Sequence, residues 1–253
     1  MKEEIRRVQN WIKEQVTNTR VDGVVLGLSG GIDSTVVAYL AVGALGADKV
    51  TIAILPCESS TSSEEDAMKV IKALNLKYAI RKDLSKSYST LKDLFGESTK
   101  TFVNSNIKSR LRMITLYAIS NQLNRMVIGT TNKTELFLGY YTKYGDGGVD
   151  IEPIVDYYKG EIYEMAKELG VPESIINKVP AADIGITLTD EEEFSKIIGE
   201  PITYNTIDSI LKAALDDGEM PELVTHKQTN GIMTLMGKTE HKRNTPPFYE
   251  RIR

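Results

Sequence analysis

The chain has few of the residues on which disulfide, zinc and redox sites depend. Its 253 residues include one cysteine, Cys57, and two histidines. A single cysteine cannot form an internal disulfide or a pair of thiolate ligands, so a disulfide framework and a CxxC zinc or redox site are excluded. Cys57 follows an apolar run and is predicted to be a small packed side chain.

An excess of positive charge is also missing. The 31 lysines and arginines are outnumbered by 35 aspartates and glutamates, which gives a formal net charge of −4. This balance argues against a broad nucleic-acid surface, where a basic footprint is expected. The sequence starts with charged residues and contains no apolar run of membrane-spanning length. We therefore expect a cytoplasmic protein with neither a nucleic-acid nor a membrane partner.

Apolar segments alternate with amphipathic ones along the first 156 residues. Helical spacing predicts a buried stripe within residues 4–16, formed by Ile5, Val8, Ile12 and Val16. Strands are predicted over 24–28, 50–55, 77–81 and 126–129, with a fifth near 149–154, and a long helix over 107–123. This order predicts an α/β fold with a doubly wound parallel sheet of about five strands and flanking helices.

From residue 157 onward the pattern is mainly helical. We expect one domain over 1–253, with a nucleotide-binding core over 1–156 and a helical part over 157–253. Two helix starts are predicted from capping residues. Ser62 and Glu65 form a capping box, and Thr189 precedes the acidic run 190–193, which is more typical of a capped, solvated helix than of a metal site.

A glycine-rich loop follows the first predicted strand. Its sequence, SGGIDS over residues 29–34, lies between an apolar strand and a predicted helix. Glycines allow backbone N–H groups to close on an oxyanion, and a helix N-terminus adds partial positive charge, so this loop is a predicted phosphate site. The lysine of a Walker A loop is absent, which disfavours a kinase or GTPase. A plain glycine turn is the alternative.

Residues 130–135 follow the fourth predicted strand. Parallel sheets bind ligands at the carboxyl ends of their strands where the strand order switches, so both loops should face one crevice. Mg²⁺ prefers hard oxygen ligands and shares them with phosphates. Asp33 and Glu135 are therefore candidate ligands for one Mg²⁺ that bridges the bound phosphates. A glycine-rich loop over 139–150 adds Lys143, Asp146 and Asp150.

The motifs resemble those of one enzyme family. SGGIDS is similar to the pyrophosphate loop of the N-type ATP pyrophosphatases. Together with NIKSRLRM, GTTNKTE, GYYTKYGDGGVD, Lys159 and the run 241–243, it resembles ammonia-dependent NAD synthetase over most of the chain. The resemblance implies a Rossmann-like, adenine nucleotide alpha-hydrolase-like fold, a homodimer and an ATP- and Mg²⁺-dependent ligase. The implied reaction amidates deamido-NAD⁺ with ammonia to NAD⁺ through an acyl adenylate, releasing AMP and pyrophosphate.

The same resemblance assigns site residues. The metal ligands are Asp33 and Glu135. The implied ATP contacts are Gly27, Leu28, Ser29, Gly30, Gly31, Ile32, Asp33, Ser34, Thr130, Lys159 and Ala181. The implied deamido-NAD⁺ contacts are Arg110, Lys143, Asp150, His241 and Lys242. Ala181 stands where the family usually has Thr or Ser, so its ATP contact is expected to be lost or limited to the backbone, and the usual glutamine-containing loop is missing from 182–188.

Ammonia must be neutral to attack the acyl adenylate, although ammonium dominates at neutral pH. A carboxylate in the crevice can bind ammonium and accept its proton, and Asp146 is the candidate catalytic base. By resemblance, the segment 101–123 lies near the dimer interface, so a charge at Ile107 is expected to separate the subunits.

Two other readings stay open on the residues alone. One is another pyrophosphate-loop enzyme, such as a GMP-synthetase-like amidase domain or a tRNA-modifying thiolase, which the acidic balance and the TKYGDGG block disfavour. The other is a nucleotide-binding sensor without turnover, which the pair of carboxylates disfavours. Glutamine is not expected as the direct nitrogen donor, although a separate glutaminase subunit remains an alternative.

Overall fold

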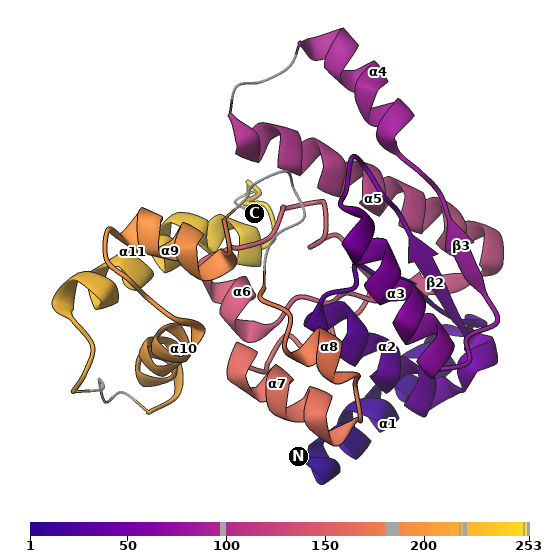
Figure 1. The fold of residues 1–253 in the computed structure, drawn as a ribbon, viewed down its shortest axis with the longest axis horizontal. Coiled ribbons are helices and arrows are strands. Elements are labelled where there is room, and N and C mark those ends of the chain that lie inside the picture. The colour runs from indigo at the N-terminus through magenta and orange to yellow at the C-terminus, as the bar shows by residue number, and fades with distance from the viewer. Residues whose placement is uncertain (97–99, 181–187, 218, 220–221, 250, 252–253) are drawn as a thin grey trace.

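A four-stranded parallel sheet lies at the centre of the fold (Figure 1). The computed structural model describes residues 1–253 apart from 97–99, 181–187, 218, 220–221, 250 and 252–253. The strand order is β3-β2-β1-β4. The strands span β1 Gly23–Gly27, β2 Val50–Ile54, β3 Ala79–Arg81 and β4 Arg125–Val127.

The prediction of a fifth strand near residues 149–154 is wrong. This segment contributes a single bridge, between Ile151 and Ile128, just beyond the end of β4. Pro153 has no backbone N–H to donate to a ladder, so pairing cannot continue through it. The other four predicted strands are present, each within a few residues of its expected bounds.

Alternate side chains of β1 enter two different cores, because successive residues of a strand point to opposite faces. Val24 and Leu26 pack with helices α1, α2, α3 and α7, while Val25 packs with α4 and α5. These helices span α1 Lys2–Thr19, α2 Ile32–Leu45, α3 Thr61–Ala73, α4 Ser85–Phe95, α5 Thr101–Leu123 and α7 Lys159–Glu168. Helices on both faces confirm the doubly wound α/β prediction.

Helix α1 buries the stripe that the spacing predicts, Ile5, Val8, Ile12 and Val16. The predicted start at Thr189 is also confirmed, since its hydroxyl accepts from the Glu192 N–H and Glu192 accepts from the Thr189 N–H. The capping box at Ser62 is wrong, because α3 begins at Thr61 after the N-cap Ser60. Several hydroxyls precede the acidic residues there, and the sequence does not distinguish between them.

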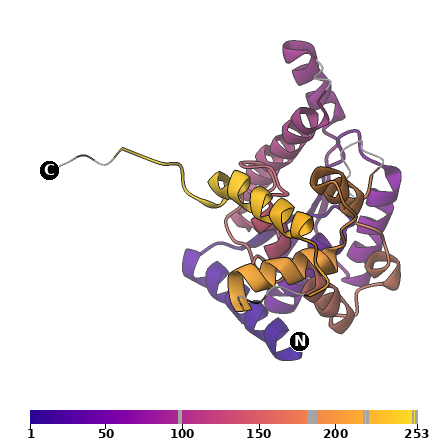
Figure 2. The same cartoon turned by 90° about the vertical axis from the view of Figure 1, so that its left-hand side faces the viewer.

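A second apolar cluster joins the later helices around Phe194, Ile207 and Ile232. The Phe194 ring lies 4.7 Å from that of Tyr140, measured between centroids. The cluster lies beside the sheet, and after α11 the chain runs away from the body (Figures 1 and 2). The remaining helices are α6 Lys133–Leu138, α8 Glu173–Ile176, α9 Asp190–Ile198, α10 Tyr204–Lys212 and α11 His226–Arg243, with a 3₁₀ turn at Ala47–Lys49 and a π turn at Ala213–Asp217.

The described helices include none with the length and apolarity needed to cross a bilayer.

Candidate functional site

The strand order reverses beside β1, which has β2 on one side and β4 on the other. The loops that follow β1 and β4 therefore leave the same edge of the sheet. Asn132 Nδ2 donates to Asp33 Oδ1 at 2.8 Å and joins the two loops directly. The prediction that they face one crevice is confirmed.

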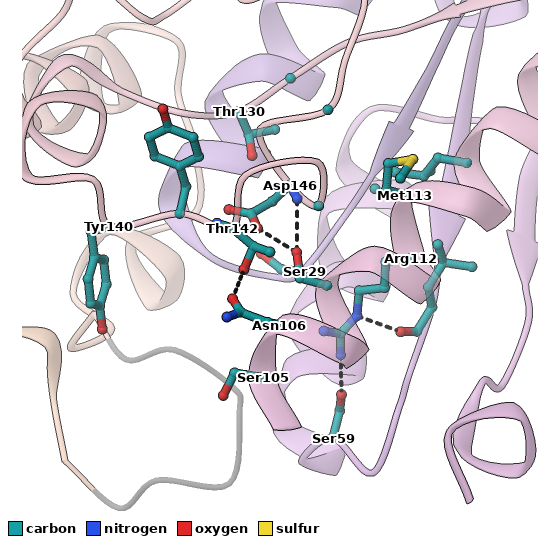
Figure 3. Close-up of a pocket in the computed structure, with 18 of the residues that line it drawn as sticks. Ser29, Ser59, Ser105, Asn106, Arg112, Met113, Thr130, Tyr140, Thr142 and Asp146 are labelled. Carbon is teal, nitrogen blue, oxygen red and sulfur yellow. Dashed lines mark hydrogen bonds between the residues drawn. The ribbon is translucent and has the colours of Figure 1, made fainter. Parts of the chain in front are cut away.

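A cavity of about 1100 Å³ opens at this edge (Figure 3). Residues from β1, β2, α5 and the loops after β4 line it, together with Lys242 from α11. Ligand pockets of about 300–1,000 Å³ hold drug-sized molecules. The cavity is therefore large enough for a dinucleotide-sized ligand or for two smaller ones.

The loop after β1 has the form of an anion cradle. Gly30 has a φ of +77°, and a Cβ there would overlap the Ser63 carbonyl oxygen, so a side chain is excluded twice over. The Ser29 hydroxyl accepts from the Gly31 N–H at 3.2 Å and lies 3.0 Å from the Ser34 hydroxyl. Helix α2 starts directly afterwards at Ile32, so its N-terminal dipole points into the loop.

Lys159 is a buried cation between the two candidate metal ligands. Its side chain is 2% exposed, and Nζ lies 2.5 Å from Asp33 Oδ2 and 3.7 Å from Glu135 Oε1. Burial lowers the pKa of Lys159, but the charges of Asp33 and Glu135 outweigh this effect and leave it raised. Burial, followed by the charge of Asp33, raises the pKa of Glu135, against the opposing effect of Lys159.

Asp33 and Glu135 fit a magnesium ion that shares phosphate oxygens. Both carboxylates lie within 4 Å of one cation, the Lys159 ammonium, so they are close enough to surround a common positive charge. Within the described part of the chain, no group of three His, Cys, Asp or Glu side chains is arranged to hold a metal. Mg²⁺ is commonly held by one or two carboxylates plus substrate phosphates, so the pair suits that mode.

Thr134 and Asp208 position Lys159, and the sequence analysis missed both. The Thr134 hydroxyl accepts from the Lys159 N–H at 2.9 Å and donates to Asp208 Oδ1 at 2.5 Å. Asp208 Oδ2 accepts from the Gly160 N–H at 2.8 Å, so the start of α7 is capped from α10. The sequence did contain one indication of this role, since Asp208 is a polar residue on the otherwise apolar face of α10.

Asp146, the predicted catalytic base, lines the cavity (Figure 3). Its Oδ1 accepts from the Ser109 hydroxyl at 2.5 Å and from the Thr142 N–H at 3.0 Å. Ser109, on α5, also accepts from the Asp146 N–H at 2.8 Å. These bonds fix the carboxylate between α5 and the glycine-rich loop. The sequence analysis missed Ser109.

Four of the five predicted dinucleotide residues gather around this loop. Lys143 Nζ donates to the His241 carbonyl, and Arg110 donates to the Lys143 carbonyl at 3.2 Å. Lys242 Nζ donates at 2.6 Å to each of the carbonyls of Gly139 and Tyr141, and burial lowers its pKa. Positive charge from α5, the loop and α11 is thus concentrated around this loop, and of these four residues Lys242 lines the cavity.

Asp150 is placed differently from the other four. Its Oδ1 accepts from the Tyr117 hydroxyl at 2.9 Å and its Oδ2 from the Val127 N–H at 2.7 Å. The carboxylate joins α5 to β4 and does not line the cavity. In this arrangement the Asp150 carboxylate stabilises the packing of α5 on β4, and its contact with deamido-NAD⁺ stays a prediction.

Ala181 lies outside the described residues, so its backbone contact to ATP also stays a prediction. Just before it, Lys178 Nζ lies 2.8 Å from Asp66 Oδ2. Asp66 is a buried residue on α3, and its Cβ is 3.0 Å from the position of a Cβ on Gly30. This ion pair fastens the chain before Ala181 to the back of the cradle.

A family model described as NAD synthase matches residues 4–246. The chain belongs to the NAD synthase family. An NH(3)-dependent NAD(+) synthetase from Methanococcoides burtonii is 43% identical over 247 residues, which cover 94% of this chain and 90% of the relative. Among solved structures, an NMN synthetase from Francisella tularensis has a TM-score of 0.88 at 34% identity, covering 99% of this chain and 98% of the other. An NH3-dependent NAD synthetase from Campylobacter jejuni has a TM-score of 0.83 at 33% identity, covering 98% of each chain.

Membership of the NAD synthase family agrees with the resemblance drawn from the motifs. The family match extends past the sheet into α11, so it includes both the cradle and Lys242 at the cavity wall.

Proposed function

We propose that this protein is a ligase that uses ATP and Mg²⁺ to amidate deamido-NAD⁺ with ammonia, yielding NAD⁺, AMP and pyrophosphate. The observation that carries the proposal is the meeting of the cradle, Lys159 and the Asp33–Glu135 pair at the switch in strand order. Asp146 and Lys242, the latter from α11, line the adjoining cavity. Family membership supports the reaction class.

In the first step, an oxygen of the nicotinate carboxylate forms a bond to the α-phosphorus of ATP, and the bond from that phosphorus to the bridging oxygen breaks. Pyrophosphate leaves with the electron pair. The N–H groups of this loop and of the first turn of α2 would hold the phosphates. Lys159 offsets the repulsion between two anionic reactants, and its charge is buried, where electrostatic effects are strong. Mg²⁺ on Asp33 and Glu135 would add charge that stabilises the departing pyrophosphate.

In the second step, ammonium loses a proton to Asp146, its nitrogen forms a bond to the acyl carbon, and the bond from that carbon to the AMP oxygen breaks, with AMP leaving with the electron pair. The added nitrogen then loses a second proton to solvent and becomes the neutral amide. Asp146 is positioned for the first of these proton transfers because Ser109 and Thr142 already fix one of its oxygens. The second oxygen has no bond to another described residue, so it is available to an ammonium ion. A mixed anhydride reacts with water, so the cavity must close before this step.

We also propose a homodimer, with α5 as part of its interface. Phe102 and Ile114 on this helix are 63% and 59% exposed, and Leu94 and Phe95 on the neighbouring α4 are 71% and 73% exposed. Contiguous exposed apolar side chains mark interaction surfaces. Helix α5 also carries Ser109 and Arg110, so a second copy would lie against the same element that forms one wall of the cavity.

The direct test mixes the purified protein with ATP, Mg²⁺, deamido-NAD⁺ and an ammonium salt and quantifies NAD⁺, AMP and pyrophosphate together. We expect the three products in equal amounts, with no NAD⁺ when glutamine replaces ammonium. A parallel reaction with nicotinate mononucleotide tests the shorter substrate, because one structural neighbour is an NMN synthetase. Release of ADP and orthophosphate would contradict the proposed cleavage.

The role of Asp146 has a separate test. Asp146→Asn should keep ATP–pyrophosphate exchange that depends on deamido-NAD⁺, because adenylation needs no base for ammonia. It should lower amide formation by about 10²–10⁴-fold, the usual contribution of a general base. Asp93→Asn, at an exposed position of α4, is the matched control. Equal loss in both half-reactions would exclude Asp146 as the base.

A further inference from the structure

Glu152 packs directly against the wall of the cavity, although no step above uses it. It follows Ile151, whose bridge to Ile128 brings this segment beside the loop after β4. A Cβ on Gly129 would overlap Cδ and both oxygens of the Glu152 carboxyl. The carboxyl therefore lies flat against Gly129, a residue that lines the cavity, while Glu152 itself stays behind it.

The Glu152 carboxyl has few polar partners. Its Oε2 accepts from the Thr131 N–H at 3.3 Å, and the side chain is half-buried. Burial raises the pKa of Glu152 to about 8, bonds from the Thr131 side chain and backbone lower it, and the charge of Asp146 raises it further. A carboxyl in such surroundings holds its proton at neutral pH, because the charged form lacks a compensating cation.

The groups coupled to Glu152 come from two loops. Thr131 belongs to the loop after β4, and Asp146 and Tyr141 belong to the glycine-rich loop. Burial raises the pKa of the Tyr141 phenol, Arg243 from α11 lowers it, and Asp146 and Glu152 raise it. Lys242, also from α11, donates to the Tyr141 carbonyl and acts on Asp146 rather than on Glu152. Neither basic side chain forms an ion pair with the Glu152 carboxyl in the described part of the chain.

We propose that Glu152 is a positioning residue for adenylation, which as a neutral acid supports the turn over residues 129–131 and keeps a further negative charge away from bound ATP. The inference rests on the proposed function. The neutral carboxyl fills the space over Gly129 and accepts a hydrogen bond from Thr131. These two contacts hold the residues on either side of Thr130 and thereby keep Thr130 at the cavity wall. Its ionisation would place a charge behind that wall, beside Asp146 and near the triphosphate, and would oppose the binding of two anionic substrates.

Adenylation without ammonia gives the cleanest readout, since ammonia itself titrates in alkaline solution. We would measure ATP–pyrophosphate exchange with Mg²⁺ and deamido-NAD⁺ between pH 6.5 and 9.5. If Glu152 must be protonated for adenylation, its single ionisation should lower kcat/KM for ATP of the natural chain about tenfold per pH unit above about pH 8. The loss should appear mainly in KM.

Glu152→Gln keeps the shape and the neutral state of the acid. We expect its exchange rate at pH 7 to stay within about threefold of the natural chain and its alkaline decline to be shifted or lost. Glu14→Gln, at an exposed position of α1, should retain the decline. If the Gln variant does not fold, Glu152→Leu tests the same removal of the ionisable group.

Two results would overturn the inference. In one, Glu152→Gln shows the same alkaline decline as the natural chain. In the other, the exchange rate of the folded variant at pH 7 is more than tenfold lower than that of the natural chain, which would mean that the acid proton or the charge of Glu152 is itself required. If the natural chain shows no exchange at any pH, the proposed function is wrong and the inference falls with it. Exchange with parallel pH profiles would instead reject only the role of Glu152.

Discussion

Replacement of Lys159 by methionine removes the cation between Asp33 and Glu135 and keeps most of the side-chain volume. The lysine is 2% exposed and its two partners are 16% and 18% exposed, so water cannot easily take over its role. Removing one member of a buried ion pair costs about 3–5 kcal/mol, because the remaining charge is left without a partner. For a chain of this length, that loss corresponds to a fall in Tm of roughly 6–20 °C.

The assay is unfolding by heat and by urea, followed by circular dichroism, with and without Mg²⁺ and in the absence of ATP. In Lys159→Met, a Mg²⁺ ion bound by the two carboxylates should restore about 1.4 kcal/mol at ten times its dissociation constant. In the natural chain, Lys159 already satisfies Asp33 and Glu135, so Mg²⁺ alone should change the free energy of unfolding much less. The variant thus tests the metal ligands through stability and not through activity.

Lys133 provides a matched control. Its Nζ also lies 3.2 Å from each of two carboxylates, those of Asp156 and Asp216, but their side chains are 86% and 41% exposed. Pairs with exposed partners contribute about 0–1 kcal/mol. The Lys133 side chain is itself 12% exposed and its ammonium lies over the Tyr158 ring, so Lys133→Met should cost less than Lys159→Met and should gain nothing from Mg²⁺. A loss below about 1 kcal/mol in Lys159→Met, or an equal response of both variants to Mg²⁺, would refute the reasoning.

Three further changes test other parts of the structure. Gly30→Ala should abolish ATP-dependent activity, because the new Cβ would overlap the Ser63 carbonyl at a φ of +77°, and equilibrium dialysis with ATP would measure the lost binding. Ile114→Glu should convert a dimer to a monomer in analytical ultracentrifugation. Ile107, the position that the sequence suggested for this test, is half-buried in the core around Val25, so a charge there would also disturb folding. Because the pKa of Glu152 is raised on folding, the folded chain holds a proton between about pH 4.5 and 8 that the unfolded chain loses. The free energy of unfolding should therefore fall with rising pH in this window, by up to about 1.4 kcal/mol per pH unit. Urea titrations of Glu152→Gln should lack this contribution to the slope.

The sequence predicts the fold well where hydrophobic spacing is regular. The buried stripe of α1 and the strands β1 and β2 follow directly from their apolar pattern, because helix and strand periods differ. The segment 149–154 has a similar apolar character, but Pro153 limits it to one bridge. Local pattern therefore predicted a strand where the structure has a single bridge to the end of β4.

The sequence predicts those parts of the site that lie within one continuous loop. It does not predict the parts that depend on contacts between segments distant in the chain. The cradle was evident from the placement of its glycines, whereas the positive φ of Gly30 became known only from the structure. The sequence cannot show that Asp208 caps α7 or that Ser109 fixes Asp146, because these bonds join residues separated by many turns of chain. The burial of Glu152 is likewise a property of the packed fold, since a single glutamate before a proline is usually solvated.

The bonds from α11 to the segment 139–141 couple the order of synthesis to the assembly of the site. Lys242 provides donors to the carbonyls of Gly139 and Tyr141, about a hundred residues earlier in the chain. On the ribosome, domains form as the chain emerges. The carbonyls of Gly139 and Tyr141 therefore gain these two bonds only after α11 has been synthesised, so this part of the cavity wall is completed last.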